Sequence, residues 1–554
     1  MITHRLMLGA LTLAANIYAG VVLAEKINMN NLSETVRILA SDEYGGRTPG
    51  TEGETKTVEY LIQHFEALGL DPGGDAGGWT QSVPLTHTRL QGDFDVKFSS
   101  DNSDWRLEQA TDLEISSVLP LTSNKIQDAP VVFVGFGASA PERGWDDYGG
   151  VDLSGKVAIY LVNDPDFSAD ASEPVSGLFG NKRMTYYGRW AYKFEEAARR
   201  GAIAALVIHE DKADGYGWNV ASSSPGENYA IATGTKGTKP VQLQGWLHLD
   251  AAIRLFEMAG YDFAEQRRLA RNSDFEAFEL SGVNFSANLQ VDVDSIISQN
   301  VLAVIPGGSH ADESIMVAAH WDAYGIGEPD SQGRVVRPGA NDDALGTAGV
   351  LELARIFKSS PTPARSIVFA LWTAEESGLL GSAAYAENPI YPIEKTVANL
   401  TLDILQTAGL ARDVILVGEG QSDLEVDLAR AAARQGRTIT PESLPENGLF
   451  FRADHFSMAR KGVPVLLLMG IAGGADLIEG GREAGDRWIS DYIGNCYHQT
   501  CDAWSPSLDL SGAAQDIELF QMIIHDLANS RRWPVWRDGS EFKAIRENSK
   551  AARR

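Results

Sequence analysis

Short, almost continuously apolar runs alternate with longer amphipathic stretches through the second half of the chain, from Ser298 onward. Continuous apolar runs are typical of strands buried on both faces, and apolar residues at helical spacing indicate amphipathic helices. The alternation predicts an α/β fold with a mostly parallel mixed sheet covered by helices on both faces. The expected strands are 314–320, 366–373, 397–403, 414–419 and 463–470, and the expected helices are 344–357 and 423–436.

A different pattern occupies the region from about residue 126 to 272. It holds the strand-like runs "PVVFVGFG", "GKVAIYLVND" and "GAIAALVIHE", with a helical pattern, "YKFEEAARRG", before the last of them. We interpret 126–272 as an inserted, β-rich α/β domain, with the Gly- and Ser-rich stretch 211–240 as a loop. Residues 25–125 and 273–540 then form one domain, with a helix over 55–68. The basic tail 541–554 is expected to be a surface helix or disordered.

The first 24 residues, "MITHRLMLGALTLAANIYAGVVLA", combine Arg5, an apolar run and a small-residue cleavage site ending at Ala24. This combination is typical of a secretory signal peptide. No later stretch has the roughly 18 consecutive apolar residues that a membrane-spanning helix needs. We therefore expect an exported protein, periplasmic or extracellular, with no membrane anchor after cleavage of residues 1–24.

The formal net charge of −28 argues against nucleic acid or an anionic membrane surface as a partner, because both would repel an acidic protein. A solvated acidic coat accounts for the charge without further assumption. With 44% hydrophobic residues the chain has enough apolar material for a sizeable core.

The chain has two cysteines, Cys496 and Cys501, in "NCYHQTCDAW". A close pair in an exported chain favours a local disulfide. The rival interpretation is a pair of thiolate metal ligands, because His498 lies between them. Zinc–thiolate sites usually have further cysteine or histidine partners at characteristic spacing, and the chain has no third thiol. We therefore predict the disulfide.

Acidic residues and histidines follow the predicted strands or begin the adjoining segments. Each has an ordinary structural explanation: Asp342 or Asp343 would cap the helix that starts near Ala344, and Glu376 would favour a helix N-terminus. Asp403 is harder to explain in this way, because an unpaired carboxylate at the end of a buried strand is costly. The candidates are His320, Asp322, Asp342, Asp343, Glu375, Glu376, Asp403 and His498.

In an open α/β sheet, ligands bind beyond the carboxyl ends of the strands, where these candidates converge. Imidazoles with several carboxylates form a mixed nitrogen and oxygen set suited to zinc, with manganese or cobalt as other possible ions. The set is too large for one tetrahedral ion. Two ions that share a bridging carboxylate would use it economically, as in many hydrolases.

The motifs "AHWDAYG", "GANDDALG", "TAEESGLLGS", "LTLD" and the late histidine in "YHQTCD" resemble, in order and spacing, those of a known family. They resemble the co-catalytic zinc exopeptidases of metallopeptidase family twenty-eight, the bacterial aminopeptidase group. The resemblance covers about 300–505. The insertion at 126–272 looks like a protease-associated domain, which in such enzymes covers part of the active-site face.

The resemblance implies two zinc ions, with other divalent metals possible. Asp342 would bridge both ions. His320 and Asp403 would complete the first site, and Glu376 and His498 would complete the second.

The resemblance also assigns catalytic roles. Glu375 would be the general base, taking a proton from a metal-bridged water and passing it to the leaving amine. Asp322 would hold the second ring nitrogen of His320 and so fix its tautomer. The implied activity is hydrolysis of N-terminal residues from peptide substrates.

One stretch departs from the family pattern. Some members place a tyrosine before an "SDH"-type motif to stabilise the developing oxyanion, whereas this chain has Phe450 and Phe451 there. Arg452, His455 and Tyr497 are candidates to replace that tyrosine, unless the metals suffice. The two phenylalanines either line a substrate pocket or belong to the core.

Three other functions stay open at this point. The same scaffold supports carboxypeptidase or other amide hydrolase activity, and related proteins include glutaminyl cyclases with a single zinc ion. Some relatives have lost their metal ligands and act as receptors, which the complete ligand set here disfavours. The sequence fixes neither the preferred substrate residue nor the oligomeric state.

Overall fold

The computed structural model describes residues 25–553 except 102, 224 and 233–238. The predicted signal peptide, residues 1–24, lies outside the described residues. Among the described helices, none is both long and apolar enough to cross a membrane.

The fold is built on a mixed sheet of 14 strands. Strands β20, β17, β13 and β16 are neighbours in that order and run parallel, and β12 follows β16 antiparallel. The mostly parallel mixed sheet predicted from the apolar runs is therefore confirmed. The bounds are β13 His310–His320, β16 Arg365–Trp372, β17 Thr396–Leu402 and β20 Val465–Leu468.

The predicted strand 414–419 forms but lies outside this sheet. It is observed as β18, Asp413–Leu416, which pairs in parallel with β19, Thr438–Pro441, in a separate two-stranded sheet. An apolar run predicts a buried strand and carries no information on which neighbour the strand pairs with.

Helices cover both faces of the sheet, as alternation in β13 illustrates. Ile315, Val317 and Ala319 enter one core cluster, whereas Met316 and Ala318 enter the other. The first face packs against α1 Met29–Leu39, α2 Glu52–Leu68, α8 Leu345–Ser359, α10 Leu424–Arg434 and α13 Ser511–Ala528. The second packs against α9 Leu380–Glu387 and α11 His455–Ala459.

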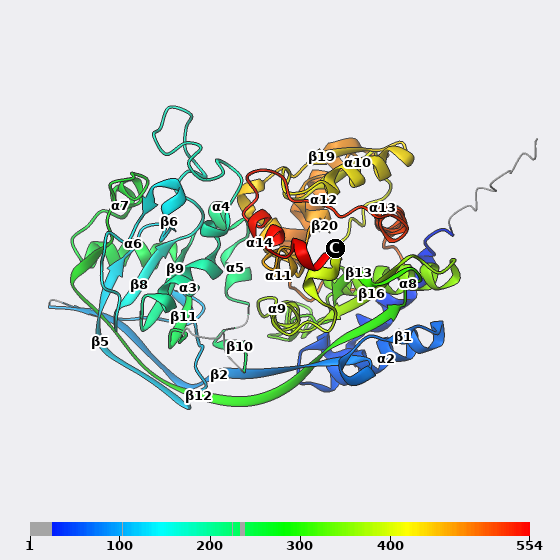
Figure 1. Cartoon of the computed structure of the whole chain (residues 1–554). Helices are drawn as coiled ribbons and strands as arrows, with labels where there is room; N and C mark the ends of the chain where they lie inside the picture. The colour runs from blue at the N-terminus through cyan, green and yellow to red at the C-terminus, as the bar shows by residue number, and fades with distance from the viewer. Residues whose placement is uncertain (1–24, 102, 224, 233–238, 554) are drawn as a thin grey trace, which may run out of the picture.

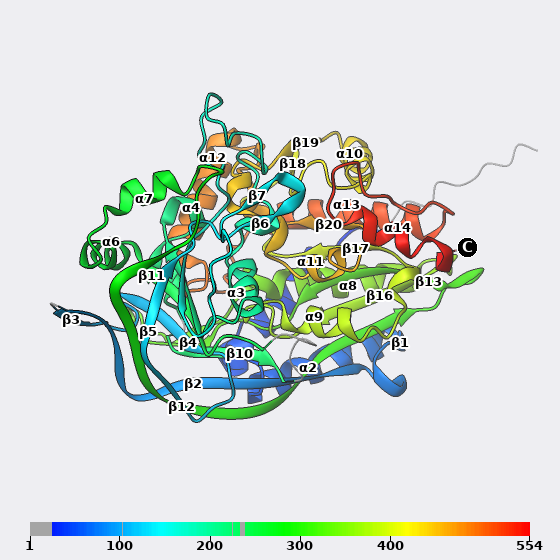
Figure 2. The ribbon, with the colours of Figure 1, turned by 60° about the vertical axis from the view of Figure 1, so that its left-hand side comes forward.

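Two long strands that the sequence did not predict join the halves of the molecule. Strand β2, Thr80–Ser100, pairs antiparallel with β12, Phe278–Ile305, over most of its length. Both views show this ribbon running from β5 on one side to β16 on the other (Figures 1 and 2). Since β12 pairs with β5 at one end and β16 at the other, one sheet continues through the whole molecule.

The segment predicted as an insertion contains its three predicted strands and packs into a separate hydrophobic core, which also takes in residues within 96–115 and 280–289 from outside the segment. Residues 211–240, predicted as a loop, contain the short elements α4 Asp211–Asp214, α5 Trp218–Ala221 and β10 Glu227–Ile231. The domain boundaries stay predictions. This part of the molecule also contains β4 Leu113–Ser117, β5 Ser123–Phe133, β8 Val157–Leu161, β9 Ala204–His209, β11 Leu243–His248, α3 Trp190–Arg199, α6 Leu249–Met258 and α7 Phe263–Leu269.

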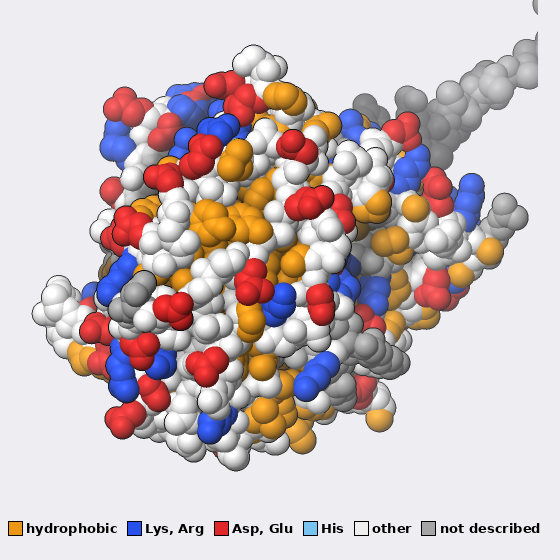
Figure 3. All heavy atoms as spheres, turned by 90° about the vertical axis from the view of Figure 1, so that its left-hand side faces the viewer, with side chains coloured by type: hydrophobic (Ala, Val, Ile, Leu, Met, Phe, Trp, Pro, Cys, Tyr) orange, Lys and Arg blue, Asp and Glu red, His pale blue; other side chains and the backbone are white. Residues whose placement is uncertain are grey.

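The surface and the C-terminal tail agree with the sequence. On the face that carries this segment, acidic side chains are interspersed with lysine and arginine (Figure 3). The tail forms α14, Lys543–Asn548, whose buried Arg546 donates through Nη2 to the carbonyl of Thr396 at 2.8 Å.

Candidate metal centre

The carboxyl ends of three neighbouring parallel strands carry the predicted ligands. His320 is the last residue of β13, Asp403 directly follows β17, and Glu375 and Glu376 follow β16 after a short turn. Because parallel strands end at the same edge of a sheet, these side chains meet at one place although they are distant in sequence.

Asp342 reaches the same place from the segment before α8. Its peptide bond to Asp343 is cis. Gly339 has a φ of +54°, and a Cβ there would lie 2.1 Å from the carbonyl oxygen of Asp342, so only glycine fits. Asp502 holds the segment through its carboxylate, which accepts the backbone N–H of Asn341 at 3.0 Å and of Asp342 at 3.1 Å.

A buried arginine ties this segment to the end of β13. The guanidinium of Arg47 donates to the carbonyls of Trp321 at 2.6 Å, Pro338 at 2.6 Å and Gly339 at 2.9 Å. The side chain is fully buried, and these contacts satisfy its donors. Sequence reasoning missed Arg47 and Asp502, because their partners are backbone groups far away in the chain.

The predicted metal ligands form two clusters that share one carboxylate. One cluster joins His320, Asp342 and Asp403, and the other joins Asp342, Glu376 and His498. The two imidazoles face the shared carboxylate from either side: His320 Nε2 lies 3.2 Å from Asp342 Oδ1, and His498 Nε2 lies 3.3 Å from Asp342 Oδ2. The structure thus brings together all five predicted ligands.

The carboxylates of this site resist ionisation in the absence of a cation. Burial raises the pKa of Asp403 to about 8. Burial also raises the pKa of Glu375 and Glu376 well above the ordinary glutamate value, and for Glu376 the neighbouring acids add to the effect. Asp342 is the exception: although burial opposes its ionisation, its contacts with the two imidazoles hold its pKa below the ordinary value. Such a crowded acidic site is completed by positive charge.

Buried polar atoms fit bound cations at the same place. Among the described residues, His320 Nε2 and Glu376 Oε1 are buried without a hydrogen-bond partner. The donor set of imidazole nitrogens and carboxylate oxygens suits zinc. The residues present therefore fit the pair of ions that the sequence predicted.

Asp322 holds the two adjacent glutamates in place. Its Oδ1 accepts the backbone N–H of Glu375 at 3.0 Å, and its Oδ2 accepts that of Glu376 at 3.3 Å. The same Oδ1 lies 3.6 Å from Nδ1 of His320, and that nitrogen is closer, at 3.2 Å, to the backbone oxygen of Asp322. The role expected for Asp322 at His320 stays a prediction. The sequence did not predict that Asp322 would bind the backbone N–H groups of the two glutamates, an arrangement called here the Asp322 brace.

His498 contacts two tyrosine rings and lies on a loop that is closed by a disulfide. Its ring centroid is 3.9 Å from that of Tyr324 and 3.7 Å from that of Tyr497. Cys496 and Cys501 form a disulfide across the loop, which confirms the predicted pairing. The stacking and the crosslink restrict where the imidazole can point.

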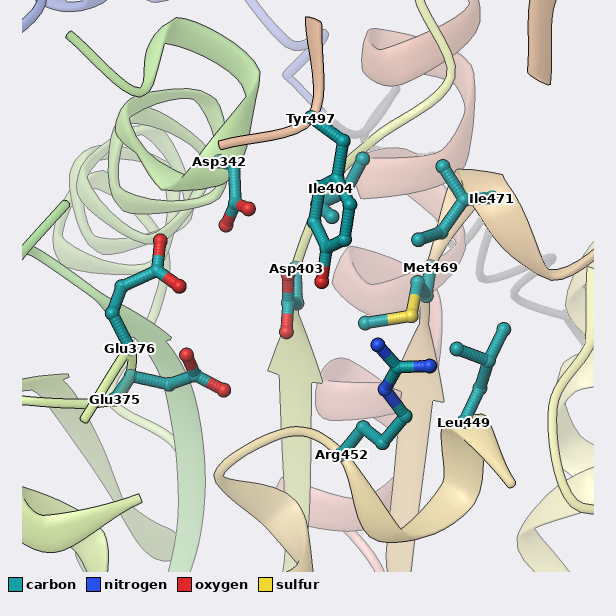
Figure 4. Close-up of a pocket in the computed structure, with 10 residues that line it drawn as sticks. All are labelled: Asp342, Glu375, Glu376, Asp403, Ile404, Leu449, Arg452, Met469, Ile471 and Tyr497. Carbon is teal, nitrogen blue, oxygen red and sulfur yellow. The ribbon is translucent and has the colours of Figure 1, made fainter. Parts of the chain in front are cut away.

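A pocket opens beside the carboxylates (Figure 4). Asp342, Glu375 and Glu376 lie on one side, Leu449 and Ile471 lie on the opposite side, and the remaining residues lie between them. The other lining residues are Asp403, Ile404, Arg452, Met469 and Tyr497.

The structure distinguishes between the alternatives left open for the stretch that differs from the family pattern. Phe450 and Phe451 are buried in a core cluster and do not line this pocket, so they are core aromatics. His455 is also fully buried, and burial lowers its pKa to about 3. Arg452 and Tyr497 do line the pocket.

Comparison with known proteins agrees with this arrangement. Residues 300–520 match the model of peptidase family M28. The aminopeptidase from Aneurinibacillus sp. strain AM-1 has a similar fold, with a TM-score of 0.53 at 19% identity, over 92% of this chain and 96% of that chain. Residues 300–520 therefore carry the peptidase family M28 pattern, and the family resemblance of the motifs is confirmed.

Curated relatives match over shorter stretches. Leupeptin-inactivating enzyme 1 of Streptomyces exfoliatus is 27% identical over 236 residues, 42% of this chain and 49% of that protein. Aminopeptidase YwaD of Bacillus subtilis (strain 168) is 32% identical over 142 residues, 25% of this chain and 29% of that protein. The chain thus spans less than half the length of these relatives.

Proposed function

We propose that the protein is an exported, zinc-dependent exopeptidase that removes N-terminal residues from peptides. The observation that carries the proposal is the pair of ligand clusters that share Asp342, with Glu375 lining the pocket beside them. The family pattern of residues 300–520 and the aminopeptidase names of similar proteins support it.

Five residues would hold two zinc ions. His320 and Asp403 would bind the first, Glu376 and His498 the second, and Asp342 both. When bound, the ions supply Lewis-acid polarisation of the scissile carbonyl and of the attacking water.

Glu375 would move the proton. A carboxylate oxygen of Glu375 would take a proton from the attacking water and deliver it to the nitrogen of the leaving amine. Its Oε2 lies 3.9 Å from His320 Nε2, close enough for action at the same reaction centre. Asp322 would keep this carboxylate in position, because it binds the backbone N–H of Glu375.

The apolar wall of the pocket would receive a substrate side chain. Leu449 and Ile471 face the carboxylates across the pocket, with Met469 beside them, and these apolar side chains would exclude water from that side. Exclusion of water strengthens the electrostatic interactions of the site.

The test uses leucine arylamide and its N-acetylated form with zinc-loaded protein. We expect hydrolysis of the free-amine substrate alone, loss of activity with a chelator and recovery with zinc. Cleavage of N-blocked peptides from the C-terminus would replace the proposal with the carboxypeptidase alternative. Zinc-loaded protein that cleaves neither substrate would overturn it.

A further inference from the structure

The pocket contains an arginine that neither ligand cluster uses. Arg452, which lies just before α11, is the one cation among the residues that line the pocket. It lies between the acidic side and the apolar side (Figure 4). Tyr497 and Asp403 also line the pocket between these two sides.

Arg452 forms no ion pair with a carboxylate in the part of the chain that the structure describes. Two buried arginines elsewhere in the fold are paired with acids: Arg365 pairs with Glu313 at 2.7 Å, and Arg437 pairs with Asp516 at 2.6 Å. Arg452 is partly buried in the pocket, and even partial removal of a charge from water is costly, so an anion that binds there would stabilise the guanidinium.

The predicted inserted segment holds the guanidinium in place. Nη1 of Arg452 lies 3.5 Å from the backbone oxygen of Asp214, and its Cζ lies 4.8 Å from the ring centroid of Tyr216. Neither contact is an ion pair. The carboxyl of Asp214 also lies near the guanidinium, but burial raises its pKa well above the ordinary aspartate value and so disfavours its anion. A guanidinium fixed in this way keeps donors free and loses little conformational entropy when it binds an anion.

A second arginine adds positive charge on the same side. Arg189 is buried, and among the described residues its side chain makes no ion pair or hydrogen bond. Burial, and then the nearby Arg452, lower the pKa of Arg189 to about 10, which leaves it charged at neutral pH. These two arginines form a positively charged spot in a chain whose formal net charge is −28.

We propose that Arg452 is a carboxylate-binding subsite, and that the preferred substrates are short peptides that present a carboxylate to it. This inference rests on the proposed exopeptidase function and adds a substrate class to it. The carboxylate is either the C-terminal α-carboxylate of a dipeptide or an acidic side chain. Planar, bidentate pairing with a guanidinium suits both.

The experiment compares substrates that differ only in that charge. One arm uses leucyl-glycine against leucyl-glycine amide, and the other uses glutamate arylamide against glutamine arylamide. We expect the zinc-loaded protein to prefer the acid in one arm by about 10- to 100-fold in kcat/KM, the usual range for a hydrogen bond to a charged group. The arm that shows the preference identifies the source of the carboxylate.

Variants separate this role from others. Arg452→Met should abolish the preference, and Arg452→Lys should keep part of it because the charge remains. The matched control is Arg460→Gln, since Arg460 also contacts a tyrosine ring, at 5.4 Å from Tyr186, but pairs with Glu195 at 3.3 Å. The control should keep the preference.

Three results would overturn the proposal: no preference in either arm for the wild type, an unchanged preference in Arg452→Met, or an equal loss on acid and neutral substrates. Calorimetry with zinc-loaded Glu375→Gln and both substrate pairs measures the preference without turnover. Absence of hydrolysis would thus refute the exopeptidase function, whereas equal binding of the acid and its neutral partner in both pairs would refute the subsite.

Discussion

The carboxylate of Asp322 accepts the backbone N–H of Glu375 at 3.0 Å, so a residue at the end of one strand fixes the turn that follows the next. Strands β13 and β16 are parallel neighbours, and Asp322 lies two residues beyond His320 at the end of β13. The brace links the histidine side of the site to its glutamates.

Asp322→Asn replaces one acceptor of this brace with an N–H donor. An amide group can accept the N–H of only one of the two glutamates, and its NH₂ group would face the other. We expect activity to fall by about 10- to 100-fold, the usual effect of losing a group that orients metal ligands. Kinetics and metal content measure this, with the exposed Asp312→Asn as control. Wild-type activity in Asp322→Asn would show that the brace is dispensable.

Glu375→Gln and Glu376→Gln separate two adjacent acids. Glu375→Gln keeps the shape but removes the base, so metal content should persist while kcat falls by about 10² to 10⁴. Glu376→Gln leaves the second ion one anionic ligand short, so zinc binding itself should weaken. Metal analysis beside kinetics on both variants decides the matter. Loss of zinc in Glu375→Gln with full zinc in Glu376→Gln would show that Glu375 is the ligand and Glu376 the base.

Substitution of both cysteines by serine tests the loop that carries His498. The disulfide closes a loop with a sequence separation of 5, so its loss frees the imidazole from one restraint. Stacking on Tyr324 and Tyr497 remains. We expect weaker zinc retention against a chelator with the fold intact by circular dichroism. Equal zinc retention in the serine variant and the wild type would assign the crosslink no role at the site.

Chelated protein should lose stability as the pH rises. Burial raises the pKa of Asp403 from 3.8 to about 8, so the protonated carboxyl is favoured in the folded state. The stability that this group contributes is therefore complete below about pH 4 and is lost as pH rises through about 8. Each such group adds a slope of about 1.4 kcal/mol per pH unit within its window.

Thermal unfolding from pH 5 to 8 measures this effect. Zinc-free protein should show a falling Tm, zinc-free Asp403→Asn a shallower fall, and zinc-loaded protein a higher Tm, because the metal binds the folded state. A Tm of the zinc-free wild type that is constant or rises over this range would contradict the expected loss of stability.

Protein recovered from outside the cytoplasm should begin after Ala24. This prediction rests on the signal-peptide pattern of residues 1–24: Arg5, an apolar run and a small-residue cleavage site. Edman sequencing or intact mass measures the new N-terminus. Exported protein that still begins at Met1 would contradict the prediction.

The sequence by itself predicted the parallel strands of the sheet and the acidic residues and histidines that meet at the candidate centre. Apolar runs such as 366–373 are local signals, since burial on both faces leaves no polar position to alternate. Asp403 stood out because its strand was predicted to be buried, and a carboxylate at the end of a buried strand needs a partner. Parallel strands share one edge, so residues at their carboxyl ends were expected to meet without knowledge of any contact.

Only the tertiary structure decided what depends on pairing between distant segments. The union of the two halves rests on β2 and β12, whose pairing partners are far apart in sequence and whose mixed pattern of exposure gives no clean period. Arg47 and Asp502 bind backbone groups, which every residue has, so no side-chain pattern points to them. That Arg452 makes no ion pair among the described residues became visible only in the packed structure, where its contacts are a backbone oxygen of Asp214 and the ring of Tyr216. The sequence cannot show this, because it does not say which side chains lie near one another.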